Sequence, residues 1–234
     1  MHSSFTLVYG LSQTLLLRKK RESLGAITDE YRRELERRER EWIRATRFHE
    51  ELSDEELVKY MLVKHPEALV LMDVLRELGF FTGILVEYGI VVGESIYQQR
   101  AYRDVVVVGV GKLFREVEPG ILEPVFIEVK YTVGNPWDPW IYFYGHGLRE
   151  HPRWLFIIRA KRRFREDPEW LKKYLKYKLR EIKKTYNLTG ELTPADNGLN
   201  EYYKLMGLPY KKTYYVVEKR DDGVIEVYKL IPEE

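Results

Sequence analysis

Glu128 and Lys130 lie in a run, Val125 to Tyr131, whose other residues are all apolar or aromatic. This composition predicts a central β-strand, in which Glu128 and Lys130 project from the same face. A buried charge without compensation is costly, so the two residues must neutralise each other, bind a metal ion or face an opening. The alternative is an edge strand whose solvated face carries an ordinary ion pair.

A second acid, Asp104, stands at the start of the hydrophobic run Val105 to Val108, in the strand expected just before that of Glu128. Two carboxylates on neighbouring strands can meet across a sheet, and Mg²⁺ prefers such oxygen ligands. The alternative for Asp104 is a turn residue at a strand entry. Because the Glu-x-Lys spacing recurs at Glu181 and Lys183 on an expected helix face, spacing alone does not identify a site.

The segments around these residues predict an α/β domain over 65–234. The expected elements are a helix over 65–79, strands over 82–92, 102–110 and 124–132, a short helix beginning at Asp138-Pro139, a strand over 154–158 and a long helix over 168–186. Two further strands, over 213–219 and 224–231, are joined by Asp221-Asp222-Gly223 and predict a C-terminal β-hairpin.

Residues 1–64 predict an N-terminal helical extension. Charged side chains dominate 28–51, with opposite charges four positions apart, which is typical of a solvated helix and makes this helix a candidate dimer element. Ser53 and Glu56 form a capping-box pattern at the start of a shorter helix. The apolar residues before position 18 are too few to span a bilayer, and the basic run follows them, so we expect neither a secretory signal nor a membrane partner.

The chain contains no cysteine, which excludes disulfides, iron–sulfur clusters and thiolate zinc sites. This composition fits a reducing compartment, so we expect a cytoplasmic protein. The charged fraction of 32% resembles that of proteins from archaeal or other thermophilic sources.

Asp104 and the tripeptide Glu128-Val129-Lys130 are similar to the motif of the PD-(D/E)xK nuclease superfamily, which places an acid in one strand and Glu-x-Lys in the next. Arg103 stands where the motif has proline, a turn former and not a ligand. The resemblance extends over residues 65–160. It implies a restriction-endonuclease-like αβββαβ core with a mixed central sheet.

Within this superfamily the sequence most resembles the archaeal Holliday-junction resolvases. They carry an acid on the first core helix and a Gly-Phe that ends it, and Glu67 and Gly79-Phe80 follow that order here. Glu67 is therefore the expected third acid, with Glu87 and Glu94 as alternatives. A longer segment between the helix and Asp104 leaves junction specificity open.

The resemblance implies a Mg²⁺-dependent DNA endonuclease, with Mn²⁺ as a substitute metal and branched or otherwise structured DNA as a candidate substrate. Asp104, Glu128 and the Val129 carbonyl would hold the metal, which acidifies a water and polarises the scissile phosphate. Lys130 would orient that water and stabilise the developing negative charge. Paired cuts would require a homodimer.

A net charge of +2 predicts no uniformly basic surface, but basic residues gather between 159 and 184. Phosphate neutralisation is a natural use of such a segment, and a solvated basic helix face is the alternative. The residues expected to contact DNA are Arg159, Lys161, Arg162, Arg163, Arg165, Lys172, Lys173 and Lys176.

Two competing functions stay open. One is a non-catalytic nucleic-acid-binding or assembly protein that keeps the nuclease fold, although the retained acids and lysine favour an enzyme. The other is a nuclease of RNA, single strands or free ends, which no residue distinguishes from a duplex endonuclease.

Overall fold

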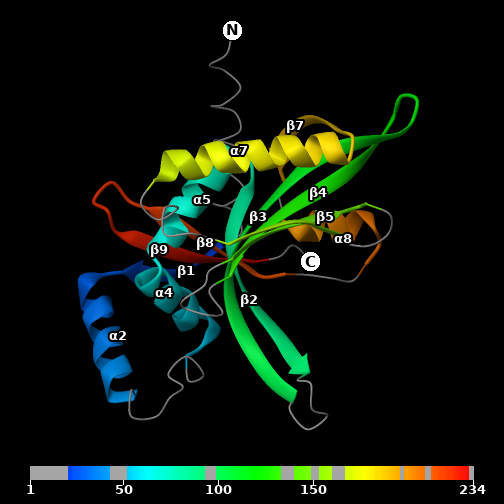
Figure 1. Ribbon diagram of the computed structural model, residues 1–234. Coiled ribbons are helices and arrows are strands. Elements are labelled where there is room, and N and C mark those ends of the chain that lie inside the picture. Colours follow the sequence, from blue (N-terminus) through cyan, green and yellow to red (C-terminus); the bar gives the residue numbers. More distant parts are fainter. Residues whose placement is uncertain are drawn as a thin grey trace.

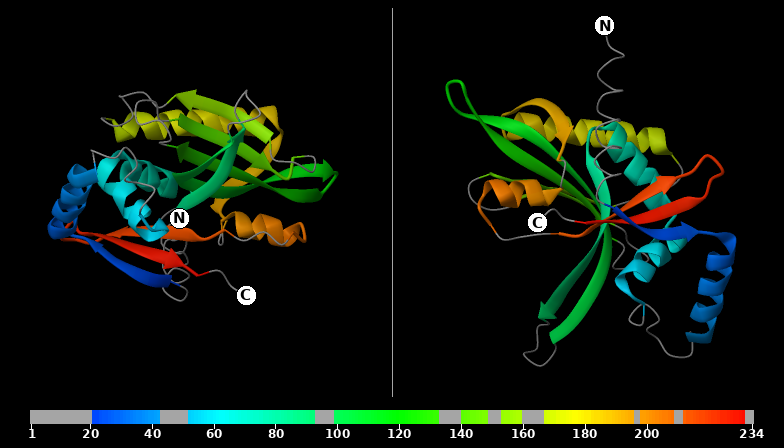
Figure 2. Two further views of the ribbon diagram at one scale, coloured as in Figure 1. Left: turned by 90° about the horizontal axis from the view of Figure 1, so that it is seen from below. Right: turned by 180° about the vertical axis from the view of Figure 1, so that it is seen from behind.

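The computed structural model describes residues 21–42, 52–92, 99–132, 140–148, 153–159, 167–195, 198–208 and 212–231 (Figures 1 and 2). These residues form a mixed α/β arrangement, as the sequence predicts. In chain order its elements are β1 (Arg21–Ile27), α2 (Asp29–Trp42), α4 (Asp54–Lys64), α5 (Glu67–Glu77), β2 (Phe81–Val92), β3 (Gln99–Glu118), β4 (Ile121–Thr132), β5 (Trp140–His146), β6 (Arg153–Arg159), α7 (Pro168–Thr185), β7 (Leu188–Pro194), α8 (Leu199–Leu205), β8 (Tyr214–Lys219) and β9 (Ile225–Leu230).

The strands form one nine-stranded sheet in the order β1-β9-β8-β2-β3-β4-β5-β6, with β7 paired to β3 beside this path. Every pairing between the described strands is antiparallel. The predicted mixed sheet is therefore wrong for this part of the chain, because β2 to β6 form an antiparallel meander.

The segment after Asp138-Pro139 is also different from the prediction. The expected short helix is replaced by β5, in which Ile141 and Phe143 are buried and alternate with the half-buried Tyr142 and Tyr144. This period of two, in β-branched and aromatic residues, favours a strand between β4 and β6 over a helix.

Helices cover both faces of the sheet (Figure 2). One face, here called the α5 face, is covered by α4, α5 and α7, and its core includes Val107 and Ile127. The other, the α8 face, is covered by α8, and its core includes Val108 and Phe126. Neighbouring positions in β3 and β4 thus belong to separate cores, because strand side chains alternate between faces.

Local signals in the sequence place several element boundaries correctly. Ser53 and Glu56 form the predicted capping box of α4, and Asp167 accepts a hydrogen bond from the Trp170 backbone amide at the start of α7. The predicted C-terminal hairpin is confirmed by the pairing of β8 with β9. None of the helices in the described ranges has the length and apolar character needed to cross a membrane.

The described parts of the expected N-terminal extension, 21–42 and 52–64, pack with the rest of the fold. β1 pairs with β9, and Val58 and Leu62 of α4 pack in one core with Leu71 of α5. The helix α2 packs against α4, through Leu35 and Leu57 and through ion pairs. The predicted boundary between residues 64 and 65 therefore falls within a continuous hydrophobic core.

Candidate functional site

The register of β2, β3 and β4 decides which acids meet. Glu128 lies opposite Val110 of β3, and Asp104 lies opposite Glu87 of β2. The stretch of β3 from Asp104 to Val110, at about 3.4 Å per residue, separates the Cα atoms of Asp104 and Val110 by about 20 Å. Asp104 and Glu128 therefore do not face each other as predicted, and the acid paired with Asp104 is Glu87.

Lys130 connects the acids of the α8 face. Its Nζ donates a hydrogen bond of 2.7 Å to Glu87 Oε1 and lies 3.6 Å from Glu128 Oε1. Lys212 joins them, with its Nζ 3.4 Å from Glu87 Oε1 and 3.7 Å from Glu128 Oε1. We call Glu87, Glu128, Lys130 and Lys212 the acid–lysine cluster. Its two lysines compensate its two carboxylates, as expected for charges in a buried strand.

Glu128 is the most enclosed member of the cluster, with 2% of its surface exposed. Its Oε2 accepts a hydrogen bond of 2.7 Å from Nε2 of the buried His146 on β5. Two buried atoms here, Glu128 Oε1 and His146 Nδ1, have no hydrogen-bond partner among the described residues. Glu128 Oε1 instead faces the two lysine ammonium groups across distances too long for a direct hydrogen bond.

The pKa shifts follow from this enclosure. Burial would raise the pKa of Glu128, but the hydrogen bond from His146 and the charges of Lys130 and Lys212 outweigh it and lower that pKa below its usual range. Burial would likewise lower the pKa of Lys130, but Glu128 and Glu87 raise it above the usual range. Burial also raises the pKa of Tyr144, which lies beside Lys130, to about 12. Both shifts favour the ionised forms of Glu128 and Lys130.

Contacts with the segment around α8 position Lys212 in the cluster. The Asn200 side chain donates to the Lys212 carbonyl at 3.0 Å and accepts from the Lys212 backbone amide at 2.7 Å. The Leu199 backbone amide donates to the Tyr214 hydroxyl at 2.7 Å, and Tyr202 packs its ring 5.4 Å from His146. These contacts hold α8 over the cluster and fix the backbone that carries Lys212.

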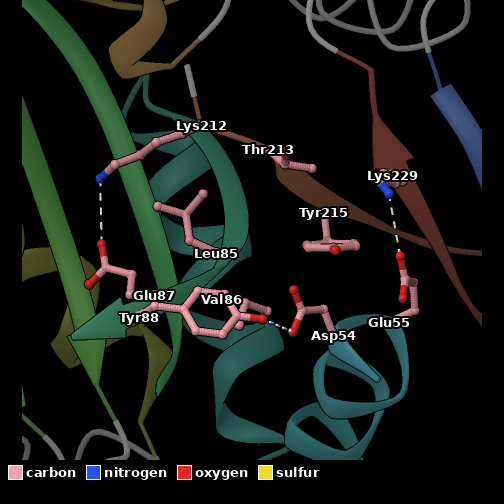
Figure 3. Close-up of a pocket in the computed structure, with 10 residues that line it drawn as sticks. All are labelled: Asp54, Glu55, Leu85, Val86, Glu87, Tyr88, Lys212, Thr213, Tyr215 and Lys229. Carbon is pink, nitrogen blue, oxygen red and sulfur yellow. Dashed lines mark hydrogen bonds and ion pairs between the residues drawn. The ribbon is translucent and has the colours of Figure 1, made fainter. Parts of the chain in front are cut away.

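A pocket of about 790 Å³ opens beside the cluster. Figure 3 shows Glu87 and Lys212 on one side of it and Tyr88 and Asp54 on another. It lies where β2 leaves β8, since the two strands pair at Ile84 and Tyr215 and then diverge (Figure 1). The cluster is therefore reached at its Glu87 and Lys212 end.

Of the residues predicted to join Glu128, Glu67 lies elsewhere, and Val129 directly follows Glu128 in β4. Glu67 is buried on the α5 face, where it accepts a hydrogen bond of 3.2 Å from Tyr131, because the apolar stripe of α5 packs on that face. Val129 lies between Gly109 and Phe143 in paired strands, so its carbonyl lies within the plane of the sheet among ladder hydrogen bonds. Glu67 and Glu128 therefore lie on opposite faces of the sheet.

The predicted DNA-binding helix lies on the opposite face from the cluster. α7 packs on the α5 face through Leu171 and Leu175, with Lys173 and Lys176 exposed and Lys172 ion-paired with Glu77. Lys161, Arg162, Arg163 and Arg165, the side chain of Arg159, and the alternative acid Glu94 lie outside the described residues. The basic face of α7 and the acid–lysine cluster thus belong to separate surfaces.

Sequence reasoning missed Lys212, His146 and Asn200. His146 ends the aromatic strand β5 and lies two and four positions after Tyr144 and Tyr142, so the period-two pattern indicated the face it shares with them. Lys212 and Asn200 carry no comparable signal, because their positions depend on the packing of α8.

Glu87 and Asp104 are register partners on neighbouring strands, but no group of three or more His, Asp or Glu side chains in the described ranges is placed to hold a metal ion. Comparisons of the chain with protein-family models, curated proteins and solved structures found no match. The functional assignment therefore rests on the residues and their geometry.

Proposed function

We propose that the protein is a Mg²⁺-dependent DNA endonuclease, in which Glu87, Asp104 and Lys130 form the reactive group. One observation carries the proposal: Glu87 lies directly opposite Asp104, and Lys130 donates a hydrogen bond to Glu87. Two acids and a lysine of the predicted kinds therefore come together on one face, with Glu87, an alternative for the third acid, replacing Glu67.

The paired acids fit a divalent cation. Directly opposed side chains on neighbouring strands have Cβ atoms about 5 Å apart, so the carboxylates of Glu87 and Asp104 could reach one cation. Mg²⁺ is commonly bound by one or two carboxylates together with water and substrate phosphate, so Glu87 and Asp104 suffice as its protein ligands. When bound, the metal would polarise a phosphate and acidify a water.

Lys130 supplies the fixed positive charge of the proposed site. Its ammonium stays charged because Glu128 and Glu87 raise its pKa. A preorganised cation in a partly enclosed site stabilises negative charge that develops on a phosphate. Glu128, held by His146, acts as a positioning residue for Lys130 and not as the metal ligand predicted from the sequence.

Cleavage assays test the proposal. Purified protein is incubated with supercoiled plasmid and with a synthetic four-way junction, in Mg²⁺ or in EDTA. We expect Mg²⁺-dependent cleavage that falls by about 100-fold or more in Glu87→Gln, Asp104→Asn and Lys130→Met. The matched control is Glu123→Gln, an exposed acid on β4, and circular dichroism checks that each variant is folded. Cleavage in EDTA, or equal activity in all variants, would overturn the proposal.

The second candidate is a non-catalytic nucleic-acid-binding protein. It is favoured by the contacts of Glu128, which His146 and two lysines hold in an ion cluster that can serve stability alone. This candidate predicts DNA binding without cleavage in Mg²⁺, and loss of binding in Lys173→Met and Lys176→Met on α7. Binding that is insensitive to both α7 variants would exclude it.

A further inference from the structure

The pocket beside Glu87 crosses the edge of β2. Glu87 belongs to the α8 face and Tyr88 to the α5 face, and both line the pocket (Figure 3). Its volume of about 790 Å³ is within the range of about 300–1,000 Å³ typical of small-ligand sites. Such a space accommodates a nucleotide-sized group but not a base-paired duplex.

Lys212 supplies the pocket with a positioned cation. The Asn200 clamp fixes its backbone, and its ammonium lies 3.4 Å from Glu87 Oε1, next to the proposed metal ligands. A lysine ammonium so placed can contact a phosphate that approaches Glu87 from the pocket.

Tyr88 supplies the pocket with an aromatic surface. Its side chain is 68% exposed, and its hydroxyl donates a hydrogen bond of 2.6 Å to Asp54, which restrains the ring at the pocket wall. Exposed aromatic rings beside cationic side chains are the usual means of stacking unpaired bases.

The other acids of the pocket wall are compensated. Asp54 lies 3.4 Å from Arg103, and Glu55 lies 3.4 Å from Lys229. These ion pairs reduce the repulsion that an anionic ligand would meet at the wall.

We infer that this pocket takes an unpaired nucleic-acid strand, with Lys212 contacting a phosphate and Tyr88 stacking on a base. The inference rests on the proposed function and narrows its substrate class to single-stranded segments, ends or extruded nucleotides. Duplex DNA alone is then a poor ligand.

Binding in EDTA tests the inference without requiring catalysis. The anisotropy of a fluorescein-labelled DNA oligonucleotide is measured as a single strand and as a blunt duplex of the same sequence. We expect the single strand to bind at least about tenfold more tightly, and Tyr88→Leu and Lys212→Met each to weaken it by about tenfold. Lys212→Met should also reduce the slope of log affinity against log salt by about 0.7.

The controls lie on α7, which contributes no residue to the lining of the pocket. Tyr177→Leu removes a tyrosine that is 52% exposed and donates its hydroxyl to Glu181, and Lys178→Met removes a half-buried lysine paired with the same acid. Both should bind as the wild type does. Equal binding of the duplex, or equal losses in these controls, would overturn the inference. Because Tyr88 is a surface residue, its variant keeps the test valid even if Lys212→Met misfolds.

The two proposals fail in different ways. Single-strand binding that depends on Tyr88 and Lys212, together with no Mg²⁺-dependent cleavage, refutes the nuclease and supports the pocket. Cleavage that depends on Glu87, together with binding that ignores Tyr88 and Lys212, supports the nuclease and refutes the pocket.

Discussion

Lys130 on β4 donates its hydrogen bond to Glu87 on β2 across the intervening strand β3, with 2.7 Å between Nζ and Oε1. The side chain passes over the apolar surface of β3, where Val108 lies opposite Lys130. The same lysine lies near the buried Glu128, so the charges that serve the proposed chemistry also contribute to the stability of the sheet.

Glu128→Gln should destabilise the protein by about 3 kcal/mol, because loss of one buried carboxylate leaves Glu87 alone to compensate Lys130 and Lys212. The glutamine oxygen can still accept from His146, while Lys130 and Lys212 lose their enclosed anion. Urea unfolding at neutral pH measures the change. Glu123→Gln on the same strand should stay within about 0.5 kcal/mol of the wild type, and equal shifts in the two variants would contradict the prediction.

The fall in the free energy of unfolding at acidic pH should depend on Glu128. Its pKa is lower in the folded protein than its ordinary value of 4.5, so the unfolded chain binds the proton more tightly. The contribution of Glu128 to stability is therefore complete above the unfolded pKa and is lost as the pH falls through the folded pKa. Urea unfolding is measured from about pH 6 to about pH 2. The free energy of unfolding should fall less steeply with decreasing pH in Glu128→Gln than in the wild type, and parallel curves for the two proteins would refute this.

Glu87 and Glu67 should differ in their effects on cleavage. Glu87→Gln removes a proposed metal ligand and should lower Mg²⁺-dependent cleavage by about 100-fold, whereas Glu67→Gln lies across the sheet and should cleave within about threefold of the wild type. Initial rates at saturating Mg²⁺ measure both. A greater loss of cleavage activity in Glu67→Gln than in Glu87→Gln would indicate that the reactive site lies on the α5 face.

Gly198→Ala should displace α8 and destabilise the protein. A Cβ at Gly198 would clash with the Tyr214 hydroxyl oxygen, 2.2 Å away. Because the Tyr214 ring is buried, it cannot move aside without disturbing the core. We expect a loss of about 3 kcal/mol in thermal or urea unfolding. The control is Gly207→Ala, which also has a positive φ (+67°, against +55° for Gly198) but has open space around it and should cost about 1 kcal/mol. Equal losses would show that the close contact with Tyr214 is unimportant.

The helices and strands near the site were largely predictable. Period-two and helical patterns placed β2, β4, β6, α5 and α7 close to their observed bounds, and the capping and turn residues placed α4 and the C-terminal hairpin. These signals are local, since they depend on neighbouring residues and on which side of an element meets a core. For the same reason the shared face of Glu128 and Lys130 followed from the sequence alone.

The partner of Asp104 was decided by a turn that the prediction overlooked. β3 continues to Glu118 and β4 begins at Ile121, so Pro119-Gly120 forms a tight turn in which Gly120 has a φ of +80°. Proline followed by glycine is a recognised turn signal, and the position of a turn sets the register of both strands. The expected long loop between residues 110 and 124 would have left Asp104 nearer Glu128.

By itself the sequence determined the types and local geometry of Glu128 and Lys130, and it included Glu87 among the candidate acids. Only the tertiary structure decided that Glu87 meets Asp104, that Glu67 and the α7 lysines lie on the opposite face, and that Lys212 and His146 complete the cluster. The physical reason is that backbone periodicity fixes which face a side chain takes within its own strand, whereas register and helix packing depend on contacts between residues distant along the chain.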